Sequence, residues 1–322
     1  MRARSPLSSQ AYNRALPHPL IDTHGDTGPM LSVCLGAKVQ LLIKDLLRLA
    51  RGQGPHLDHF EAEWLLADVL TRSRAWLYAH ADDAIEDFAR QRFLELWERR
   101  CRGEPYAYLV GVREFYGRRL RVTPDVLVPR ADTECLLEAA LARLAPECAA
   151  CVFDAGTGSG ALAINVALER PFAHVIASDR SAAALRVARQ NAHDLNAAVS
   201  FVQANWLLAI ADSSVDLLIS NPPYLSSDDL RLHGDSLAFE PLGALVAGAS
   251  GLEDIEQLCV ESRRVLRVGG YLLLEHGCSQ GAQTRACLAA AGLVDVLTLK
   301  DLEARDRVSL ARQPGDLEMS PP

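Results

Sequence analysis

A glycine-rich run near the middle of the chain has residue types suited to binding chemistry. The run reads Asp154-Ala155-Gly156-Thr157-Gly158-Ser159-Gly160. Glycines let the backbone turn tightly and come close to a ligand, and this run joins a segment typical of a strand to one typical of a helix. Its spacing is GxGxG, whereas the usual dinucleotide fingerprint is GxGxxG. The run predicts a ligand-binding turn with a carboxylate, Asp154, just before the first glycine.

An acid at the end of the next expected strand extends this site. Asp179 closes the run Val175–Asp179, where a carboxylate can bind both hydroxyls of a ribose. The same acid could instead serve the following helix, which Ser181 could also cap. Together, the glycine turn and the strand-end acid favour an adenosyl cofactor such as S-adenosylmethionine. Asp154 would then receive the amino group of the methionine moiety.

Asn205 and Trp206 follow a third expected strand, Val199–Gln203. An adenine ring could meet an amide and an aromatic side chain there. Taken by itself, a tryptophan at such a position is more typical of a core. In combination with the glycine turn, we assign both residues to the cofactor site.

The tetrapeptide Asn221-Pro222-Pro223-Tyr224 directly follows a fourth expected strand. Two prolines cannot continue a sheet ladder, so they hold the backbone rigid at the carboxyl edge of the sheet, where ligands bind. An amide nitrogen is a poor nucleophile because its lone pair is delocalised, and a site that methylates it must fix it in line with the methyl carbon. Asn221 and the Pro222 carbonyl could each accept one N–H, and Tyr224 could stack on the planar amide. The motif predicts catalysis by positioning and preorganised electrostatics.

Strand-like and helix-like segments alternate from Asp132 to Arg312. This alternation predicts an α/β fold with a mostly parallel, doubly wound sheet and helices on both faces. The expected strands are Val152–Asp154, Val175–Asp179, Val199–Gln203, Val215–Ser220, Tyr271–Glu275, Val294–Leu299 and Arg307–Ala311. The expected helices are Ala161–Leu168, Ala182–Leu195, Ile255–Leu266 and Gln280–Ala291.

The preceding segment, from Ala37 to Cys101, has apolar residues at helical spacing and predicts a small helical bundle. Asp58 is the expected N-cap of one helix, and Asp82 or Asp83 the expected start of a longer one. Strand-like residues on both sides of Gly117 predict a β-hairpin that connects the two domains.

Composition limits the classes of partner. The chain has 33 Lys and Arg against 41 Asp and Glu, and its net charge of −8 argues weakly against nucleic acid as the main partner. Eight arginines between Arg99 and Arg130 form either a solvated face or a partner-docking surface. Cys148 and Cys151 lack the further ligands that a zinc site needs. With no apolar stretch of membrane-spanning length and no secretory signal, we expect a cytoplasmic protein without a metal, a membrane contact or a direct nucleic-acid partner.

From about Glu61 to Arg312 the chain resembles the bacterial release factor glutamine methyltransferases, the HemK/PrmC family. Besides the glycine turn and Asn221–Tyr224, the resembling runs are Glu104–Leu109, Phe115–Gly117, Val128–Glu134, Phe239–Pro241 with Ala244-Leu245, and Leu274–Gly277. The resemblance implies a seven-stranded, Rossmann-like class I methyltransferase domain joined by a β-hairpin to a small N-terminal helical bundle. It also implies transfer of a methyl group from S-adenosylmethionine to the side-chain nitrogen N5 of the glutamine in the Gly-Gly-Gln motif of class 1 peptide chain release factors.

We accordingly expect five segments. Residues 1–36 would be a disordered extension or a reading-frame artefact, 37–104 a helical substrate-docking domain, 105–128 a β-hairpin hinge, 129–312 the methyltransferase domain and 313–322 a disordered tail. The expected catalytic residues are Asn221, Pro222 and Tyr224, and the expected substrate-binding residues are Asn221, Pro222, Pro223 and Tyr224. The expected cofactor-binding residues are Asp154, Gly156, Thr157, Gly158, Ser159, Gly160, Asp179, Asn205, Trp206 and Asn221.

Two positions depart from the family's pattern. Asn205 stands where members often carry Asp, although an amide oxygen can still accept a hydrogen bond from an adenine amino group. Ala304 stands where the pattern DLxGxDR has Gly, which predicts an altered turn near the C-terminus.

Four other functions fit parts of the pattern. A glutamine methyltransferase acting on a ribosomal protein would share every motif above. An N6-adenine DNA methyltransferase would suit Asn221–Tyr224, but it needs a basic cleft for a flipped base. A nicotinamide dehydrogenase is disfavoured by the GxGxG spacing, and a non-catalytic cofactor-binding protein by the intact Asn221–Tyr224 run.

Overall fold

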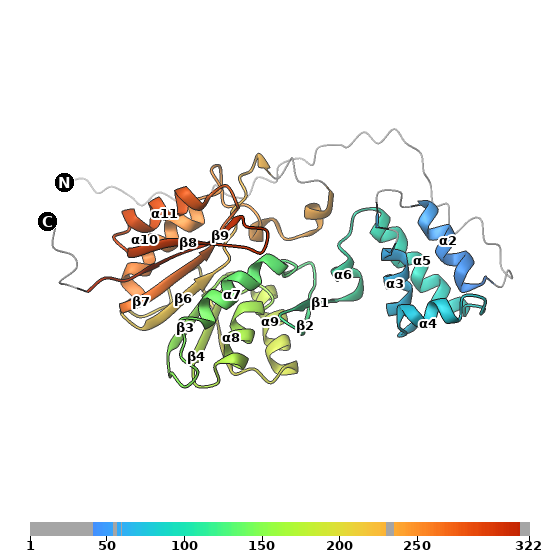
Figure 1. Cartoon of the computed structure of the whole chain (residues 1–322), viewed down its shortest axis with the longest axis horizontal. Coiled ribbons are helices and arrows are strands. Elements are labelled where there is room, and N and C mark those ends of the chain that lie inside the picture. Colours follow the sequence, from blue (N-terminus) through green and yellow to red (C-terminus); the bar gives the residue numbers. More distant parts are fainter. Residues whose placement is uncertain (1–40, 54–56, 59, 230–234, 316–322) are drawn as a thin grey trace, which may run out of the picture. The chain divides into compact units, whose positions relative to one another are not determined.

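A computed structural model describes residues 41–53, 57–58, 60–229 and 235–315 (Figure 1). The chain divides into two compact units, 1–41 and 42–322. Nearly all of the first unit, and with it the expected extension 1–36, lies outside the described residues, as does most of the expected tail 313–322. The helices and strands below all belong to the second unit.

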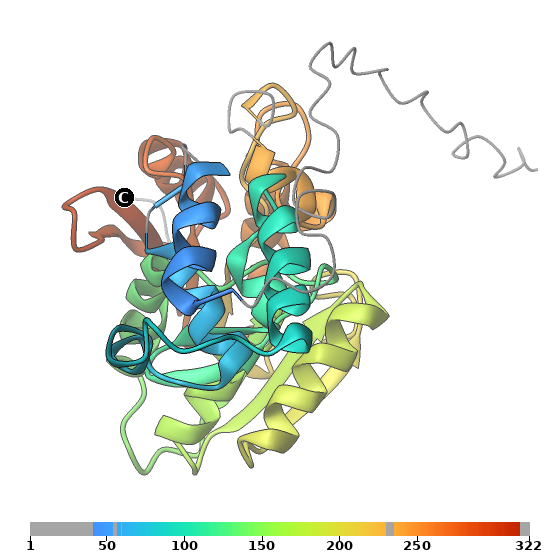
Figure 2. The same cartoon turned by 90° about the vertical axis from the view of Figure 1, so that its right-hand side faces the viewer.

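Within the described part of the chain, four helices form the expected bundle: α2 (Ile43–Gln53), α3 (Glu61–Leu70), α4 (Arg74–Ala79) and α5 (Asp87–Cys101) (Figure 2). Their apolar faces are buried, with Leu46, Leu65 and Phe93 fully shielded from solvent. The Trp97 indole N–H donates to the Ala50 carbonyl at 3.1 Å, which joins α5 to α2. The helical prediction for this segment is confirmed.

Both predicted helix starts in the bundle are wrong, the first for a local reason and the second for a long-range one. The N-cap position of α3 is Phe60, and Asp58 instead accepts the Phe60 N–H at 2.9 Å in the turn before the helix. Helix α5 begins at Asp87, because residues 81–84 bond to the start of α2: the Ile43 N–H donates to the Asp83 carbonyl at 3.1 Å. Local sequence cannot show that this segment has a partner elsewhere.

The connection between the domains contains a short helix and the predicted hairpin. Helix α6 (Tyr106–Val110) leads into β1 (Val112–Phe115), which pairs antiparallel with β2 (Arg118–Arg121). The two turn residues, Tyr116 and Gly117, have φ of 50° and 70°. Two consecutive positive φ values match the twist of a tight hairpin.

Most of the arginine-rich segment is engaged within the chain. Six of its eight arginines form ion pairs: Arg99 with Glu104, Arg100 with Glu61, Arg102 with Glu98, Arg118 with Glu169, Arg121 with Asp194 and Arg130 with Glu240. Arg113 and Arg119, both on the hairpin, are exposed. Arg113 and Arg119 are therefore the two arginines of this segment that remain candidates for docking a partner.

The second domain is built on a seven-stranded sheet with the order β5-β4-β3-β6-β7-β9-β8. Its strands are β3 (Cys151–Ala155), β4 (His174–Asp179), β5 (Val199–Gln203), β6 (Val215–Ser220), β7 (Leu266–Glu275), β8 (Val294–Lys300) and β9 (Asp306–Arg312). Pairings among β3 to β7 are parallel, whereas β9 runs antiparallel to β7 and β8. The predicted α/β fold is confirmed.

Helices cover both faces of this sheet (Figure 1). Helices α7 (Glu134–Leu141), α8 (Ala161–Glu169) and α9 (Ala182–Asp194) contribute to one core, and α10 (Glu253–Val265) and α11 (Gly281–Ala290) to the other. Consecutive strand residues alternate between the cores: Val152, Leu217 and Leu273 face the first, and Phe153, Leu218 and Leu272 the second. Because both faces are buried, the strands read as continuous apolar runs.

The start of β7 and the turn after β8 both concern positions for which the sequence made a prediction. Strand β7 begins at Leu266, where the preceding helix was expected to end, because Gly269 and Gly270 exchange backbone hydrogen bonds with Gln313 and extend the strand. The turn after β8 forms with Ala304 at φ 61°, in the left-handed region that favours glycine. Among the described residues, no helix is long and apolar enough to cross a membrane.

Candidate active site

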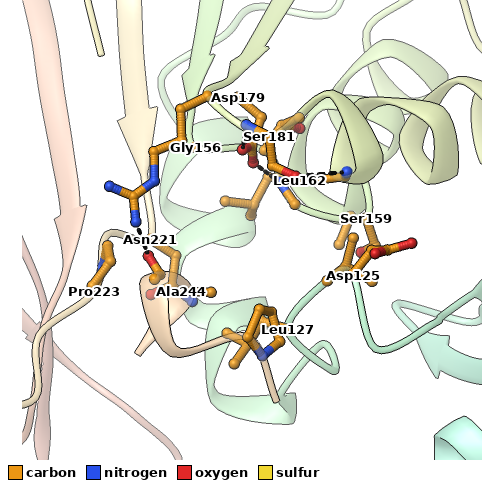
Figure 3. A pocket seen from close by; sticks show the side chains of 18 of the residues that line it. Asp125, Leu127, Gly156, Ser159, Leu162, Asp179, Ser181, Asn221, Pro223 and Ala244 are labelled. Carbon is orange, nitrogen blue, oxygen red and sulfur yellow. Dashed lines mark hydrogen bonds between the residues drawn. The ribbon is translucent and has the colours of Figure 1, made fainter. Parts of the chain in front are cut away.

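A cavity of about 270 Å³ lies at the carboxyl ends of β3, β4 and β6 (Figure 3). The sheet order reverses at β3, whose neighbours are β4 on one side and β6 on the other. Such a switch point leaves a crevice where ligands bind in open α/β sheets. The lining includes Gly156, Thr157, Gly158, Ser159, Asp179, Asn205, Trp206, Asn221 and Pro223 from the predicted site.

The glycine turn is shaped for close approach. Gly156, Gly158 and Gly160 all have positive φ, between 55° and 85°. A Cβ on Gly156 would lie 3.1 Å from the Trp206 ring, so a side chain there would force the ring to shift by a few tenths of an ångström. Gly160 does not line the cavity; its hypothetical Cβ would meet Ile164 of α8 at 2.8 Å. It therefore serves the packing of the turn on the helix.

Asp179 serves the following helix and also holds the glycine turn. One carboxylate oxygen accepts the Ser181 N–H at 2.8 Å, and the other accepts the Gly158 N–H at 3.0 Å. Ser181 in turn caps α9 by accepting the Ala184 N–H at 3.2 Å. Asp179 thus links the glycine turn to a helix start while its side chain lines the cavity.

Asp154 lies behind the glycine turn rather than on the cavity wall. Its side chain is 1% exposed, and one oxygen accepts from the Thr157 hydroxyl at 2.6 Å and the Ala163 N–H at 3.3 Å. The other oxygen, Oδ1, has no hydrogen-bond partner among the described residues. Burial raises the pKa of Asp154 to about 7. An uncompensated buried acceptor of this kind is suited to an incoming cation.

The Asn221–Tyr224 run divides between the cavity and the core. Asn221 and Pro223 line the cavity toward one end, and Asp125 and Ser159 lie toward the other (Figure 3). Pro222 and Tyr224 are not among the lining residues, and burial raises the pKa of the Tyr224 hydroxyl to about 12. The Tyr224 carbonyl accepts from the Gln280 side chain at 3.0 Å, which fixes the run from behind.

Two further cavity walls were not assigned from the sequence. One is the segment Asp125–Arg130, and the other is the loop Pro241–Ala244. Buried Glu240 joins them, since its carboxylate accepts the Val128 N–H at 2.9 Å and pairs with Arg130. Both walls lie in or beside the runs that carry the family resemblance. The two walls are more than a hundred residues apart in the chain, so the local sequence could not predict that they meet.

Among the described residues, no group of three or more His, Cys, Asp or Glu side chains is placed to hold a metal ion. Cys148 and Cys151 are both free thiols.

Comparisons with known proteins agree with this architecture. Residues 40–111 match the PrmC N-terminal domain family, and residues 132–233 match the methyltransferase small domain family. Among solved structures, the hMettl16 catalytic domain in complex with MAT2A 3'UTR hairpin 6 superposes with a TM-score of 0.50 at 15% identity, covering 73% of this chain and 86% of that one. At that identity the likeness shows a shared fold.

Relatives in sequence are much closer. The release factor glutamine methyltransferase of Xylella fastidiosa (strain Temecula1) is 46% identical over 261 residues, which are 80% of this chain and 94% of that protein. The Escherichia coli (strain K12) protein of the same description is 42% identical over 266 residues, 82% of this chain and 95% of that protein. The Neisseria gonorrhoeae protein is 47% identical over 258 residues, with 80% and 94% covered. The chain therefore belongs to the release factor glutamine methyltransferase family.

Proposed function

We propose that this methyltransferase transfers a methyl group from S-adenosylmethionine to the side-chain nitrogen of a glutamine in class 1 release factors. One observation carries the proposal: a single cavity joins the glycine turn and Asp179 to Asn221 and Pro223. A cofactor held by the first pair would present its reactive end to the second. Relatives at 42–47% identity are described as release factor glutamine methyltransferases.

The residues at the cofactor end fit S-adenosylmethionine chemically. That cofactor supplies, when bound, a methyl group made electrophilic by a positively charged sulfur. Asp154 offers a buried acceptor without a partner for the cationic amino group, and Asp179 offers a carboxylate for ribose hydroxyls. Trp206 and exposed Asn205 line the wall where an adenine would lie. Asp154 sits one layer behind the lining, so we place its contact at the base of the turn.

At the substrate end, the residues of this chain act on the amide by positioning it. The Asn221 side-chain oxygen would accept one amide N–H and the Pro222 carbonyl the other, which aims the nitrogen lone pair at the methyl carbon. Pro223 forms the adjacent wall, and we assign Tyr224, which lies behind the lining residues, to flank the bound amide. The transfer would form a nitrogen–carbon bond at the expense of the carbon–sulfur bond of the cofactor, and one proton would leave the nitrogen to solvent. These contacts lower the barrier because they are in place before reaction.

We assign protein docking to the helical domain, residues 37–104, and to the hairpin. Arg113 and Arg119, the exposed hairpin arginines that form no ion pair among the described residues, are suited to an acidic surface. Remote contacts of this kind convert binding energy into positioning at the reacting centre. A free glutamine or a short peptide should therefore be a far poorer substrate than an intact release factor.

The test is to incubate the full chain with methyl-labelled S-adenosylmethionine and, separately, a class 1 release factor, ribosomal proteins or duplex DNA. Peptide mass spectrometry then locates the label. We expect one methyl group on the glutamine of the Gly-Gly-Gln loop and none on a release factor with alanine at that position. Label on DNA or on a ribosomal protein, with none on the release factor, would reject the proposal.

A further inference from the structure

A buried acid lies directly behind Asn221. Glu275 ends β7, next to the end of β6, where Ser220 pairs with Leu274. Its side chain is 1% exposed. The side chains of Thr133 and Asn221 lie close enough to lower its pKa as hydrogen-bond partners. Thr133 comes from a third element, the 3-10 helix η1 (Ala131–Thr133), and lines the cavity beside Asn221.

The side-chain amide of Asn221 has two faces with opposite chemistry. Its Nδ2 group carries two donors, and its Oδ1 atom is an acceptor. Nδ2 donates to the Thr133 hydroxyl oxygen at 3.1 Å. An ionised carboxylate can only accept, so its bond with Asn221 also takes an Nδ2 donor. Both donors are then directed at Thr133 and Glu275, which leaves Oδ1 for the cavity.

We propose that Glu275, together with Thr133, is a positioning residue that fixes the side-chain amide of Asn221 with Oδ1 toward the substrate. The inference rests on the proposed function, in which Oδ1 grips an N–H of the target glutamine. A flipped Asn221 would present donors to donors and repel the amide. The buried acid thus selects the one orientation of Asn221 that can bind.

The protonation state of Glu275 decides whether this arrangement holds. Burial raises the pKa of Glu275 to about 7, while the Thr133 hydroxyl and Arg307 on β9 lower it and Asp132 on η1 raises it. The Tyr224 hydroxyl also faces this group. Above that pKa both carboxylate oxygens accept, whereas below it one oxygen carries an O–H donor and a single acceptor oxygen is left for Asn221 and Thr133. Activity should rise with pH through about 7.

The first test compares Glu275→Gln with the wild type across pH. Glutamine keeps the shape but places an NH2 donor against Asn221, so kcat should fall by about 10–100-fold, with KM for the release factor changed less than about threefold. The acid limb of the kcat–pH profile near 7 should disappear. Glu275→Asp, which keeps the charge, should recover part of the rate and retain an acid limb.

Thr133 provides a matched pair of variants. Thr133→Ser keeps the hydroxyl and should stay within about threefold of wild-type kcat, whereas Thr133→Val keeps the shape and should lose about tenfold. A wild-type rate and pH profile in Glu275→Gln would overturn the proposal. So would a Glu275→Gln variant whose rate falls only in step with cofactor affinity and melting temperature, since that marks a structural role.

A spectroscopic readout separates this inference from the proposed function. In 15N–1H spectra, the Asn221 side-chain NH2 signal, assigned by its loss in Asn221→Ala, should shift with pH through about 7 in the wild type and not in Glu275→Gln. If the wild type shows this shift yet methylates no glutamine, the proposed function fails while the positioning contact stands. If the signal ignores pH, the contact is absent whatever the activity.

Discussion

Two buried carboxylates, one in the helical bundle and one in the methyltransferase domain, differ in how completely they are hydrogen-bonded. Glu63 and Glu275 are both 1% exposed. Glu63 accepts from Tyr78 at 2.7 Å, from Arg74 at 2.7 Å and from Arg51, and both its oxygens are engaged. Glu275 has one oxygen, Oε2, without a hydrogen-bond partner among the described residues.

The electrostatics follow from these partners. Burial raises the pKa of Glu63, but its tyrosine and two guanidinium partners outweigh that and lower the pKa below its ordinary value. Around Glu275, burial prevails and raises the pKa to about 7, as it does for Asp154 behind the glycine turn. The two acids are equally buried, so burial does not explain why their pKa values shift in opposite directions. The difference is that both oxygens of Glu63 have hydrogen-bond partners, whereas one oxygen of Glu275 has none among the described residues. Incompletely paired buried acids beside a cavity are typical of functional sites.

The largest effect should come from Asn221, the residue that the incompletely paired acid holds. Asn221→Ala removes the preorganised acceptor and should lower kcat by roughly 10²–10³-fold, while cofactor affinity by calorimetry stays within about tenfold. Asn221→Asp is the sharper test, because it sets a second carboxylate against Glu275. We expect it to be as inactive as alanine near neutral pH. A wild-type rate in either variant would show that the run is merely a rigid turn.

The two acids should also affect stability with opposite pH dependence. The folded-state pKa of Glu63 is lowered, so its stabilisation is full above the unfolded pKa and is lost as pH falls through the folded value. The folded-state pKa of Glu275 is raised, so its ionisation costs stability as pH rises from about 4.5 to about 7. From pH 5 to pH 8, Glu275→Gln should gain on the order of 1–3 kcal/mol relative to the wild type. Glu63→Gln should be less stable than the wild type at pH 7.

Denaturant unfolding at pH 3, 5 and 8 measures both differences. The Glu63→Gln deficit should shrink at pH 3 and stay nearly constant between pH 5 and pH 8, where Glu275→Gln changes. Parallel pH dependence of the two variants would contradict the distinction drawn between these acids. Methyl transfer per folded molecule should be unchanged in Glu63→Gln, which makes it the control for the rate loss in Glu275→Gln.

Asp179 is a third case, because its carboxylate links the glycine turn to α9 and, in the proposed function, also binds the ribose of the cofactor. Asp179→Ala should weaken S-adenosylmethionine binding by roughly 1–3 kcal/mol, since the ribose hydroxyls lose their charged partner and the Gly158 N–H loses its acceptor. Asp179→Asn keeps an acceptor for one N–H and should lose less. Calorimetry showing equal affinity in all three proteins would remove Asp179 from the cofactor site.

The sequence predicted the fold where the signal was local. Apolar runs defined all seven strands of the sheet, and the residues flanking Gly117 defined the hairpin. The predicted helix start at Asp82–Asp83 failed because the deciding hydrogen bonds come from α2, far along the chain. The start at Asp58 failed locally, because its side chain accepts the Phe60 N–H two residues on. Propensity and capping patterns describe a segment's own preferences, and a tertiary partner overrides them.

In the candidate site, too, some residues could be predicted from local sequence and others could not. The glycine turn, Asp179, Trp206 and Asn221 each follow a strand end, and parallel strands bring those ends together, so their gathering around one cavity was predictable. The roles of Glu240 and Glu275 were not. Each acts through partners from other elements, Val128 for the first and Thr133 for the second, and a buried acid in a sequence has no mark that names its partners.

The smallest expected effect concerns the turn near the C-terminus, where an alanine adopts a backbone conformation suited to glycine. Ala304 has φ 61°, and the Asp301 side chain accepts the N–H groups of Glu303 and Arg305, each at 3.0 Å, so the turn cannot relax without losing those bonds. Ala304→Gly should remove the strain and raise the free energy of unfolding by roughly 0.5–1 kcal/mol. Ala286→Gly, at an exposed position inside α11, is the matched control and should lower it by about 1 kcal/mol. Thermal unfolding of the two variants gives the answer: opposite signs support strain at Ala304, and a loss of stability in both would mean that the alanine conformation carries none.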